Sequence, residues 1–495
     1  MTIQEFRTPS PTLPGAVTRG QLFIDGEWRP SSDGGTANII NPATCAVVST
    51  VAAGTTADIN AAVNAAKAAF ADGRWSGLSG RERSRVLNKA ALLIRERAEE
   101  LALTESTDVG KPITFARVVD VATAADQYEY VAAMAQQLDG SVRETPLQAH
   151  AFTKKEPLGV VAAITPFNFP LILSSTKIAA ALAAGNSVVH KPAGDTPLSA
   201  LLMAEILTDA GVPPGVFNVV TGSGGSLGDH LVAHAEVSKV AFTGSTEVGR
   251  HVSALASQNL RPVTAELGGN AANILFADAD LDKAIGTVIG AFVFNSGQFC
   301  MGGPRLLVER PIYETVLGML KGGVAGVPVG DPSDPETVMG PLASRKQLEK
   351  VAGYVDAARA EGGEIIVGGE PLDLNGGFFY KPTVIAGLGN NSPAVREEIF
   401  GPVLTVQPFD TDEEAIELAN STEYGLASGV QTSSIARAHR VSSKLDAGIV
   451  WVNSWALLDP AVPFGGVKNS GWGREYGPEA LESYTRTKSV IIATD

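Results

Sequence analysis

The chain has 495 residues, more than a single hydrophobic core usually supports, so we expect two or three domains. Hydrophobic residues make up 44% and charged residues 18% of the sequence, a balance that excludes wholesale disorder and is ordinary for an α/β enzyme. The net charge of −15 argues against nucleic acid or an anionic membrane surface as the main partner.

Cysteine content and apolar runs indicate the compartment. Cys45 and Cys300 are the only two cysteines, too few for a disulfide framework, which fits a reducing cytosol. Residues 1–18 are polar and rich in proline, without the apolar segment of a signal peptide. No apolar run approaches the roughly 18 residues that a membrane-spanning helix needs. We therefore predict a cytoplasmic protein that binds neither membranes nor nucleic acid.

The first part of the chain is predicted to be scaffold. Residues 1–20 are expected to form a flexible arm, and residues 21–28 alternate around Asp25-Gly26, which is typical of a hairpin turn. An alanine-rich segment predicts a helix over residues 58–70 with Asp58 as its N-cap. Two longer helices are predicted over residues 80–106 and 115–138.

Short apolar strands alternate with helices from residue 159 onward. The predicted strands cover residues 160–164, 187–190, 216–220, 239–242, 262–266 and 272–276. The helices between them are predicted over residues 171–184, 197–210, 226–235 and 246–258. This βαβ alternation predicts a Rossmann-like, doubly wound parallel sheet that binds its ligand at the carboxyl ends of the strands.

A second strand and helix series follows and predicts a second α/β domain. Its strands are predicted over residues 305–308, 364–367, 403–409 and 448–453, and its helices over residues 284–294, 311–324, 344–361, 413–419 and 434–443. Strand-like segments at residues 150–156 and 488–493 could pair with each other or with another subunit. The predicted fold class is therefore α/β, with two sheet domains and a small β extension.

One cysteine stands in a setting suited to chemistry. Cys300 follows the predicted helix over residues 284–294 and is surrounded by small residues, including Gly297, Gly302 and Gly303. Glycines carry no Cβ, so backbone can come close to whatever approaches the sulfur. A nucleophilic thiol needs such access and nearby amide donors, whereas an inert core cysteine beside a turn is the alternative.

Two glycine-rich loops follow predicted strands. Residues 222–228 resemble a dinucleotide fingerprint, but the last glycine comes one position late. Residues 244–249 resemble a phosphate-binding P-loop, but Arg250 stands where that loop requires lysine. Because both loops precede a predicted helix, their N–H groups could bind a pyrophosphate. A purely structural turn is the alternative.

Three polar side chains lie at predicted strand ends. Asn168 lies between Pro166 and Pro170, so its amide could be a rigid oxyanion donor or could bond its own turn. Lys191 would place a cation at the binding edge of the sheet, unless it is an ordinary surface lysine. Glu266 precedes a glycine pair and could be a base or simply exposed.

Seven motifs together resemble the aldehyde dehydrogenase superfamily, in its order and approximate spacing, over roughly residues 20–490. They comprise residues 165–170 (TPFNFP), 191–193 (KPA), 242–245 (FTGS), 266–269 (ELGG), 297–300 (GQFC), 397–402 (EEIFGP) and 463–466 (PFGG). The resemblance implies an NAD(P)-dependent, non-acylating aldehyde dehydrogenase, an oxidoreductase without a metal site.

The resemblance implies a catalytic role for each of five residues. Cys300 would attack the aldehyde carbon, and the Asn168 amide with the Cys300 backbone N–H would hold the oxyanion. After hydride transfer, Glu266 would activate water to release the acid from the thioester. Lys177 and Glu475 match positions associated with the proton path from this base.

The implied cofactor is NAD, with NADP as an alternative. Many family members have a glutamate that bonds the adenosine 2′-hydroxyl where Gly194 stands here, so a 2′-phosphate would meet no carboxylate at this position. Lys191 would bond the adenosine ribose and Glu398 the nicotinamide ribose. The implied cofactor-binding residues are Thr165, Pro166, Phe167, Lys191, Gly224, Gly228, Phe242, Gly244, Ser245, Leu267, Gly268, Glu398 and Phe400.

The implied substrate tunnel is apolar. Thr176 stands where many family members have a bulky aromatic residue, and no Arg or Lys is present to hold a substrate carboxylate. We therefore expect a neutral, hydrophobic aldehyde, aliphatic of medium chain length or aromatic. By position, the tunnel would be lined by Phe169, Leu173, Thr176, Phe299, Met301, Trp455, Leu457 and Phe464.

The resemblance also implies domains and assembly. Residues 1–139 and 158–265 would bind the dinucleotide, residues 266–483 would carry the cysteine, and residues 140–157 and 484–495 would build a homodimer or homotetramer. Three alternatives stay open: a semialdehyde or betaine aldehyde dehydrogenase, a CoA-acylating relative and a catalytically silent relative. Glu266 argues against CoA acylation, because a base that activates water competes with CoA.

Overall fold

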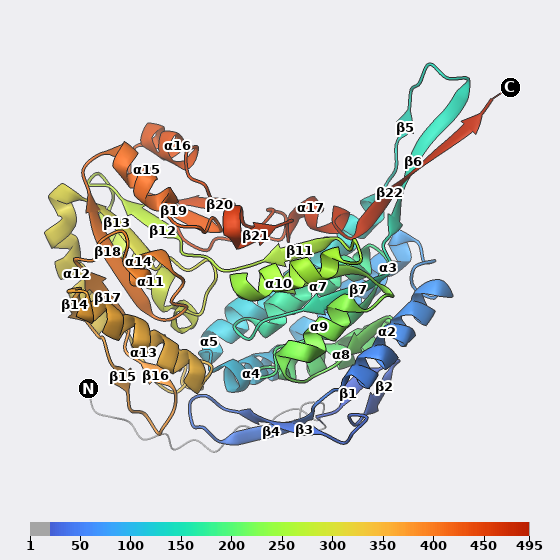
Figure 1. Cartoon of the computed structure of the whole chain (residues 1–495), viewed down its shortest axis with the longest axis horizontal. Coiled ribbons are helices and arrows are strands. Elements are labelled where there is room, and N and C mark those ends of the chain that lie inside the picture. Colours follow the sequence, from blue (N-terminus) through green and yellow to red (C-terminus); the bar gives the residue numbers. More distant parts are fainter. Residues whose placement is uncertain (1–19, 495) are drawn as a thin grey trace.

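A computed structural model describes residues 20–494, and the predicted flexible arm lies, apart from Gly20, outside the described residues. Two large sheets lie side by side, and a small sheet projects from the molecule beside the first (Figure 1). The α/β class with a doubly wound sheet, a second α/β sheet and a β extension is confirmed. Within residues 20–494, no helix is both long enough and apolar enough to cross a membrane.

The first sheet has eight strands in the order β2-β1-β9-β8-β7-β10-β11-β21, and β9 through β11 are parallel. The two edges are antiparallel, at β1 and at β21. The strand bounds are β1 (Leu22–Ile24), β2 (Glu27–Arg29), β7 (Val160–Ile164), β8 (Ser187–Lys191), β9 (Phe217–Val219), β10 (Val237–Thr243), β11 (Val263–Glu266) and β21 (Gly471–Trp472).

Helices cover both faces of this sheet because successive side chains of a buried strand point to opposite faces. Val161 and Ala163 pack into one hydrophobic cluster, and Val160, Ala162 and Ile164 pack into another. The surrounding helices are α2 (Thr56–Ala71), α3 (Gly80–Glu96), α4 (Ala98–Val109), α6 (Ala122–Met134), α7 (Pro170–Ala183), α8 (Leu198–Ala210), α9 (Gly224–Ala233) and α10 (Thr246–Ser257).

Three predictions for the first part of the chain are wrong in detail. The helix expected over residues 80–106 is two helices, because Arg97 leaves the helical region with ψ of 25°. The helix expected over residues 115–138 contains a π-helical turn, η1 (Ala116–Val121), between α5 (Ile113–Phe115) and α6, and ends in η2 (Ala135–Gln137). Asp58 is not the N-cap; Thr55 is, and Asp58 completes a capping box by accepting the Thr55 N–H at 2.8 Å.

The second sheet has seven strands in the order β14-β17-β18-β13-β12-β19-β20, all parallel except the edge strand β14. Sequence patterns missed β17 and β19, which are short and, in β19, rich in small and polar residues. The strand bounds are β12 (Ala272–Leu275), β13 (Arg305–Glu309), β14 (Glu364–Val367), β17 (Thr383–Ala386), β18 (Val403–Phe409), β19 (Ala427–Gln431) and β20 (Ile449–Val452).

The remaining helices and short elements complete the molecule; most lie around the second sheet, whereas α17 packs on α6 and α7 beside the first. The helices are α11 (Leu281–Val293), α12 (Tyr313–Ala325), α13 (Arg345–Ala360), α14 (Pro393–Arg396), α15 (Asp412–Asn420), α16 (Ile435–Ser442) and α17 (Gly477–Glu482), with the short turns η3 (Phe294–Gly297), η4 (Arg310–Ile312) and η5 (Lys468–Ser470). Two small hairpins are formed by β3 (Thr36–Ile40) with β4 (Val47–Ala52) and by β15 (Pro371–Leu372) with β16 (Phe379–Tyr380).

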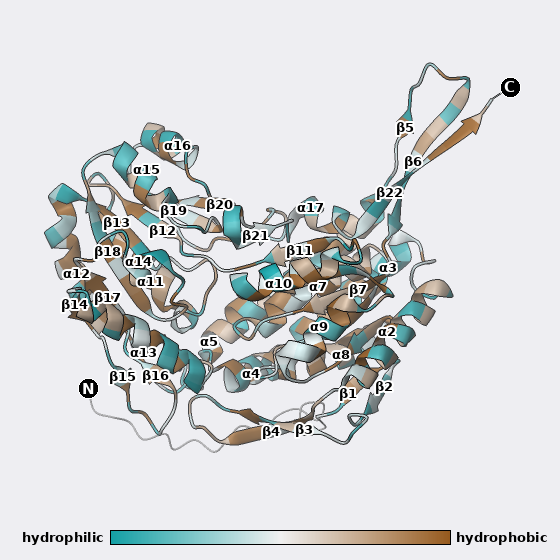
Figure 2. Cartoon of the chain, in the orientation of Figure 1, coloured by the Kyte–Doolittle hydropathy of each residue, from teal (hydrophilic) through white to brown (hydrophobic). Residues whose placement is uncertain are grey.

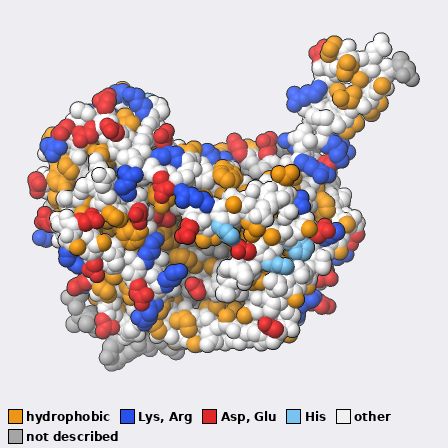
Figure 3. Space-filling view, viewed as in Figure 1, with side chains coloured by type: hydrophobic (Ala, Val, Ile, Leu, Met, Phe, Trp, Pro, Cys, Tyr) orange, Lys and Arg blue, Asp and Glu red, His pale blue; other side chains and the backbone are white. Residues whose placement is uncertain are grey.

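The projecting sheet, called the arm below, consists of β5 (Val142–Arg143), β6 (Ala149–Pro157) and β22 (Thr485–Ala493). The predicted pairing of the two end strands with each other is confirmed: β22 runs antiparallel to β6 along its whole length. Hydrophobic side chains lie exposed on the arm (Figures 2 and 3), among them Val142, Ile491 and Ile492. The domain boundaries and the role of the arm in assembly stay predictions.

Candidate active site

Four strands of the first sheet deliver polar residues to one edge. Ile164 of β7 is in register with Lys191 of β8, and Thr243 of β10 with Glu266 of β11. Because these strands are parallel, their carboxyl ends meet at the same edge of the sheet. The loop after β7 carries Asn168 to this edge.

The loop before Cys300 has an unusual backbone. Asn295, Ser296 and Gly297 are successive residues with positive φ, of 50°, 55° and 71°. A Cβ at Gly297 would lie only 2.0 Å from the backbone oxygen of Gly401, so only glycine fits there. Left-handed non-glycine residues cost free energy and persist where the surrounding structure holds them, which is common at functional sites.

Hydrogen bonds hold this loop against the second half of the molecule. The Ser296 hydroxyl donates to the Gly340 oxygen at 2.8 Å, and the Gln298 side-chain oxygen accepts the Ala343 N–H at 2.9 Å. Cys300 follows at once and is partly buried. The thiol is therefore presented by a rigid, strained loop and not by a packed core element.

The electrostatic environment favours the protonated form of the Cys300 thiol. Burial, and then the negative charges of Glu398 and Glu266, raise the pKa of Cys300 to about 12. A thiolate is the nucleophilic form, so attack requires a base or an added positive charge nearby.

Glu266 has an unusual environment for a carboxylate. Its side chain is buried, and neither carboxylate oxygen has a hydrogen-bond partner among the described residues. Burial, and then the charge of Glu475, raise its pKa well above the usual range. A buried carboxylate without donors is a strong base once it is ionised.

Asn168 lies against the cysteine loop. Its side-chain nitrogen donates to the Gln298 oxygen at 3.0 Å, and the Asn295 side-chain nitrogen donates to the Asn168 backbone oxygen at 2.9 Å. An amide nitrogen carries two N–H groups, so one stays available for an oxyanion beside Cys300.

A buried ion pair joins the two halves of the site. Lys177 of α7 contacts a Glu475 carboxylate oxygen directly and donates to the Thr243 hydroxyl at 2.5 Å. The second Glu475 oxygen lies 2.9 Å from the Thr176 hydroxyl. Glu475 raises the Glu266 pKa and Lys177 lowers it, so the pair is electrostatically linked to the base.

Lys191 lies near a glycine-rich helix start. Burial lowers its pKa to about 8, and its ammonium group donates to the Pro192 oxygen at 3.0 Å. A Cβ at Gly228 would lie 3.9 Å from the Lys191 side chain, whereas one at Gly224 would meet open space. The start of α9 therefore leaves room for a ligand beside a cation.

The neighbouring helix start is closed on itself. The Ser245 hydroxyl caps α10 by accepting the Val248 N–H at 3.3 Å. The Phe242 ring covers Gly244, where a Cβ would lie 2.5 Å from it, and Leu267 packs in the same way on Gly249. The Thr165 hydroxyl oxygen lies 3.0 Å from Nε2 of the buried His190 ring.

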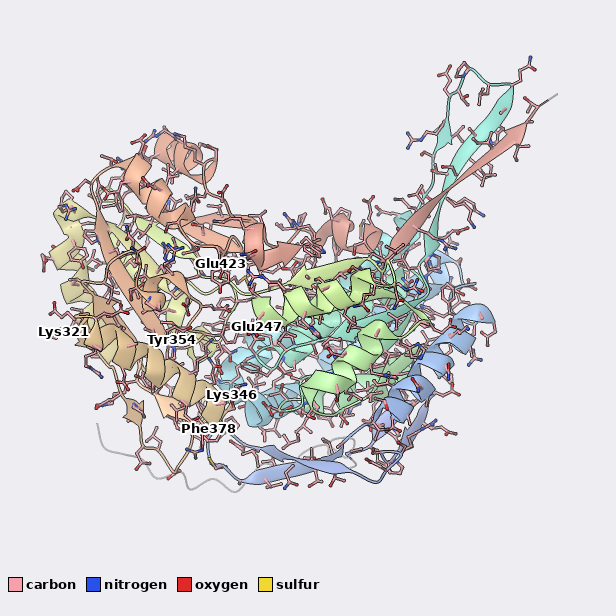
Figure 4. The ribbon with its side chains drawn as sticks, viewed as in Figure 1. Glu247, Lys321, Lys346, Tyr354, Phe378 and Glu423 are labelled. Atoms are coloured by element: carbon pink, nitrogen blue, oxygen red, sulfur yellow. The ribbon has the colours of Figure 1, made fainter. Side chains whose placement is uncertain are left out.

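Glu398 and Phe400 reach the same edge from the second half. One Glu398 carboxylate oxygen accepts the Gly269 N–H at 2.9 Å, and the other lies against Gly268. Burial raises the pKa of the Glu398 side chain to about 7. Phe400 has a positive φ of 60°, and its ring lies 5.8 Å from that of Phe167. Helix α13, whose Tyr354 is labelled in Figure 4, holds this segment: the Tyr354 hydroxyl donates to the adjacent Glu397 at 2.6 Å.

A cavity of about 460 Å³ opens at Cys300. Its walls are predominantly apolar and aromatic, and the rings of Phe169, Phe294 and Phe299 contact one another at centroid distances of 5.3 to 5.9 Å. The lining comprises Phe115, Val119, Thr123, Phe169, Ile172, Leu173, Thr287, Gly290, Ala291, Val293, Phe294, Phe299, Cys300, Met301, Val338, Trp455, Ala456, Leu458, Phe464, Glu475 and Tyr476.

Two residues predicted for the tunnel do not line this cavity. Thr176 is only 1% exposed and turns towards Glu475, so it adds no room beside the substrate. Leu457 is 71% exposed, and its neighbour Leu458 takes the lining position. The other six predicted residues, Phe169, Leu173, Phe299, Met301, Trp455 and Phe464, surround the cavity, and their contact with substrate stays a prediction.

Several lining residues were missed by sequence analysis. Phe115 and Val119 belong to a predicted helix whose periodicity could not show which face meets the cysteine. Phe294 was hidden in the apolar run before Cys300, although an aromatic residue so close to it was a usable signal. Tyr476 directly follows Glu475 and has a positive φ of 60°.

The fold and the site define a class of protein: a dinucleotide-binding α/β enzyme with a thiol nucleophile. Within residues 20–494, no group of three or more His, Cys, Asp or Glu side chains could hold a metal ion. The family model for the aldehyde dehydrogenase family matches residues 28–490. The chain therefore belongs to the aldehyde dehydrogenase family.

Solved structures match over nearly the whole chain. Betaine aldehyde dehydrogenase from Staphylococcus aureus in complex with NAD+ has a TM-score of 0.95 and 39% identity, with 96% of this chain and 95% of that chain covered. A point mutant of that enzyme with NAD+ and a BME-modified cysteine has a TM-score of 0.95 and 39% identity, with 97% of each chain covered. A Burkholderia cenocepacia protein assigned as an aldehyde dehydrogenase has a TM-score of 0.95 and 42% identity, with 97% of this chain and 98% of that chain covered.

Proposed function

We propose that the protein oxidises a neutral, hydrophobic aldehyde, aliphatic of medium chain length or aromatic, to its carboxylic acid with reduction of NAD(P). The observation that carries this proposal is the apolar cavity that Cys300 helps to line. Among the described residues that line it, Glu475 alone is charged, and the Glu475 carboxylate is paired with Lys177. An aldehyde with an apolar chain would bury that chain without leaving a charge unpaired.

The cofactor proposal rests on the polar groups at the carboxyl edge of the first sheet. Lys191 and the open start of α9 fit the adenosine and phosphate portion, because N–H groups at a helix start attract anions. Glu398 and Phe400 fit the nicotinamide ribose and ring. NAD, when bound, would accept at its nicotinamide ring the hydride that leaves the carbon bonded to Cys300. Gly194 places no carboxylate against a 2′-phosphate, so NADP is also accommodated.

The residues divide the chemistry between them. Cys300, as thiolate, adds to the aldehyde carbon, and the Asn168 amide with the Cys300 N–H stabilises the oxyanion. After oxidation to the thioester, Glu266 takes a proton from water as the water oxygen adds to the carbonyl carbon. The C–S bond then breaks, and Cys300 leaves as the acid forms. Glu475, which is paired with Lys177, then receives the proton from Glu266.

Betaine aldehyde is the second candidate substrate. The Staphylococcus aureus relative is named for it, and the aromatic walls of this cavity could contact a quaternary ammonium group. The cavity offers that cation no free carboxylate, which favours neutral aldehydes. Semialdehydes are disfavoured because no Lys or Arg is among the lining residues.

Initial rates of NADH and NADPH formation over an aldehyde panel test the proposal. We expect hexanal and benzaldehyde to give higher kcat/KM than betaine aldehyde or succinate semialdehyde, and Cys300→Ala to give no cofactor reduction. A strong preference for either charged aldehyde would refute the substrate class. Cofactor binding without reduction of NAD or NADP by any aldehyde would indicate a silent relative.

We also propose that the arm joins copies of the chain into a homodimer or homotetramer in the cytoplasm. Its exposed apolar residues, Val142, Ile491 and Ile492, are 71%, 63% and 52% exposed, which is costly for an isolated projecting sheet. Light scattering with Ile491→Asp tests this. We expect a smaller assembly than wild type; an unchanged mass would refute the role of the arm.

A further inference from the structure

Thr176 places a single hydroxyl between two acceptors. Its oxygen lies 3.1 Å from the Leu173 backbone oxygen, one turn earlier in α7, and 2.9 Å from a Glu475 carboxylate oxygen. A hydroxyl has one proton, so it can donate to only one of these acceptors at a time. The side chain is 1% exposed, so bulk water does not replace either bond.

Lys177 is the cation that pairs with Glu475. The Glu475 carboxylate oxygen Oε1 is paired with Lys177, which also donates to the Thr243 hydroxyl. Glu266, Lys239, Cys300, Tyr476 and Tyr484 are the further titratable groups that interact electrostatically with Glu475. Among residues 20–494, only the Thr176 hydroxyl is hydrogen-bonded to the other carboxylate oxygen, Oε2.

The two hydrogen-bond arrangements suit two protonation states. When Glu475 is ionised, Thr176 donates to it. When Glu475 carries a proton on the same oxygen, that proton can be donated to the Thr176 oxygen, and the hydroxyl proton turns to the Leu173 oxygen. The heavy atoms stay in place, and both states remain fully bonded.

We propose that Thr176 is a positioning residue for proton release: its hydroxyl reverses its hydrogen bond when Glu475 takes up the proton that Glu266 has removed from water. The inference rests on the proposed function. Valine at this position would keep the shape but leave a protonated Glu475 without an acceptor. Proton transfer from Glu266 would then be less favourable, and hydrolysis of the thioester would slow.

The effect is confined to one step. In the attack by Cys300, Glu266 can itself hold the single proton that the thiol loses, so attack and the oxidation of the adduct do not need the Thr176 hydroxyl. Hydrolysis does need it, because the water oxygen adds to the thioester carbon only as Glu266 accepts a proton. A nucleophile that does not depend on Glu266 would bypass the defect.

Stopped-flow measurement of NADH with the full-length enzyme tests the proposal, using Thr176→Val and Thr176→Ser. For Thr176→Val we expect a burst of about one NADH per Cys300 at the wild-type rate, followed by a steady state slower by roughly tenfold, the loss expected for one buried hydrogen bond. Thr176→Ser, which keeps the hydroxyl, restores the steady state.

Hydroxylamine gives a second readout that packing alone would not move. Its nitrogen adds to the thioester carbon, the C–S bond breaks, and a hydroxamic acid and free Cys300 result. We expect hydroxylamine to raise the turnover of Thr176→Val towards the wild-type rate. Thr208→Val is the matched control, because its hydroxyl donates within α8 to Ala204 at 2.7 Å, away from the site.

The outcomes separate this inference from the proposed function. Wild-type turnover with an unchanged steady state in Thr176→Val would overturn the role of Thr176 alone. A slower burst, or a raised KM with normal turnover, would assign Thr176 to substrate packing and also overturn it. Absence of NADH formation by wild type with every aldehyde would overturn both.

Discussion

Two buried clusters of lysine and carboxylates flank the cavity, and their difference separates chemistry from scaffolding. The cavity cluster consists of Thr176, Lys177, Glu266 and Glu475, and the back cluster of Glu105, Lys111 and Asp120. In the cavity cluster Glu475 lines the cavity, and Glu266 has no hydrogen-bond partner among the described residues. A carboxylate left without donors beside a thiol is available for proton transfer.

The back cluster holds the wall of the same cavity from behind. Lys111 contacts Asp120 directly, lies 3.7 Å from Glu105, and sits 4.0 Å from the centre of the Phe169 ring. Glu105 in turn accepts the Leu171 N–H at the start of α7, at 3.1 Å. Neither carboxylate lines the cavity, so this cluster fixes the segment around Asn168 and Phe169. Lysine and carboxylate side chains therefore position the backbone here, because each of them contacts a partner within the protein.

The largest effect is expected from the cavity cluster. Glu266→Gln keeps the shape but removes the base, so we expect steady-state turnover to fall by roughly 10²- to 10⁴-fold. The NADH burst should remain, because oxidation precedes hydrolysis. Stopped-flow measurement of NADH gives the burst and the turnover. Urea unfolding gives the free energy of unfolding, which should not fall. Loss of the burst together with turnover would contradict the assignment.

Lys111→Met should have its main effect on stability. It leaves Glu105 and Asp120 buried without their cation, and breaking a buried ion pair costs about 3–5 kcal/mol. Urea unfolding measures the loss. Lys89→Met is the control, since Lys89 is exposed and bonds only the Asp209 oxygen, and its change should stay within about 0.5 kcal/mol. Equal losses would show that the back cluster is not special.

Glu398→Gln tests the electrostatics of the thiol. The Glu398 charge raises the Cys300 pKa, so its removal lowers that pKa and increases the thiolate fraction at a given pH. Iodoacetamide should alkylate Cys300 faster in the variant, by severalfold, and the ratio to wild type should grow as pH rises through the Glu398 pKa of about 7. Glu397→Gln, one residue earlier, is the control and should match wild type.

The smallest effect is expected at Asp108, which accepts the Leu198 N–H at the start of α8 at 3.0 Å. Burial raises its pKa well above the usual range, which favours the protonated, uncharged form. Asp108→Asn keeps a neutral acceptor, and we expect a change in unfolding free energy below about 1 kcal/mol. A loss as large as that of Lys111→Met would show that Asp108 is ionised and belongs to the back cluster.

Sequence patterns were informative where residue type alone carries the signal. Short apolar runs identified the strands that end at Lys191 and Glu266, because a buried parallel strand is apolar along most of its length. The strained loop before Cys300 was marked by Gly297, where only glycine fits. Patterns failed where tertiary contacts decide: the partner of Thr176 lies 299 residues away, at Glu475.

Other misses have the same physical cause. The back cluster depends on a π-helical turn that brings Asp120 to Lys111, and no local propensity marks such a turn. Leu457 and Leu458 are equally apolar, so only the path of the backbone decides which one faces the cavity.

The pairing within the arm has a consequence for synthesis of the chain. Arg486 of β22 bonds Glu156 of β6 across 330 residues of sequence. On the ribosome, β6 is therefore made long before its partner, and on its other side β5 covers only a short part of it. An unpaired strand edge templates association with other chains. The edge of β6 therefore stays unpaired during most of translation, and the sheet of the arm is complete only after β22 has emerged.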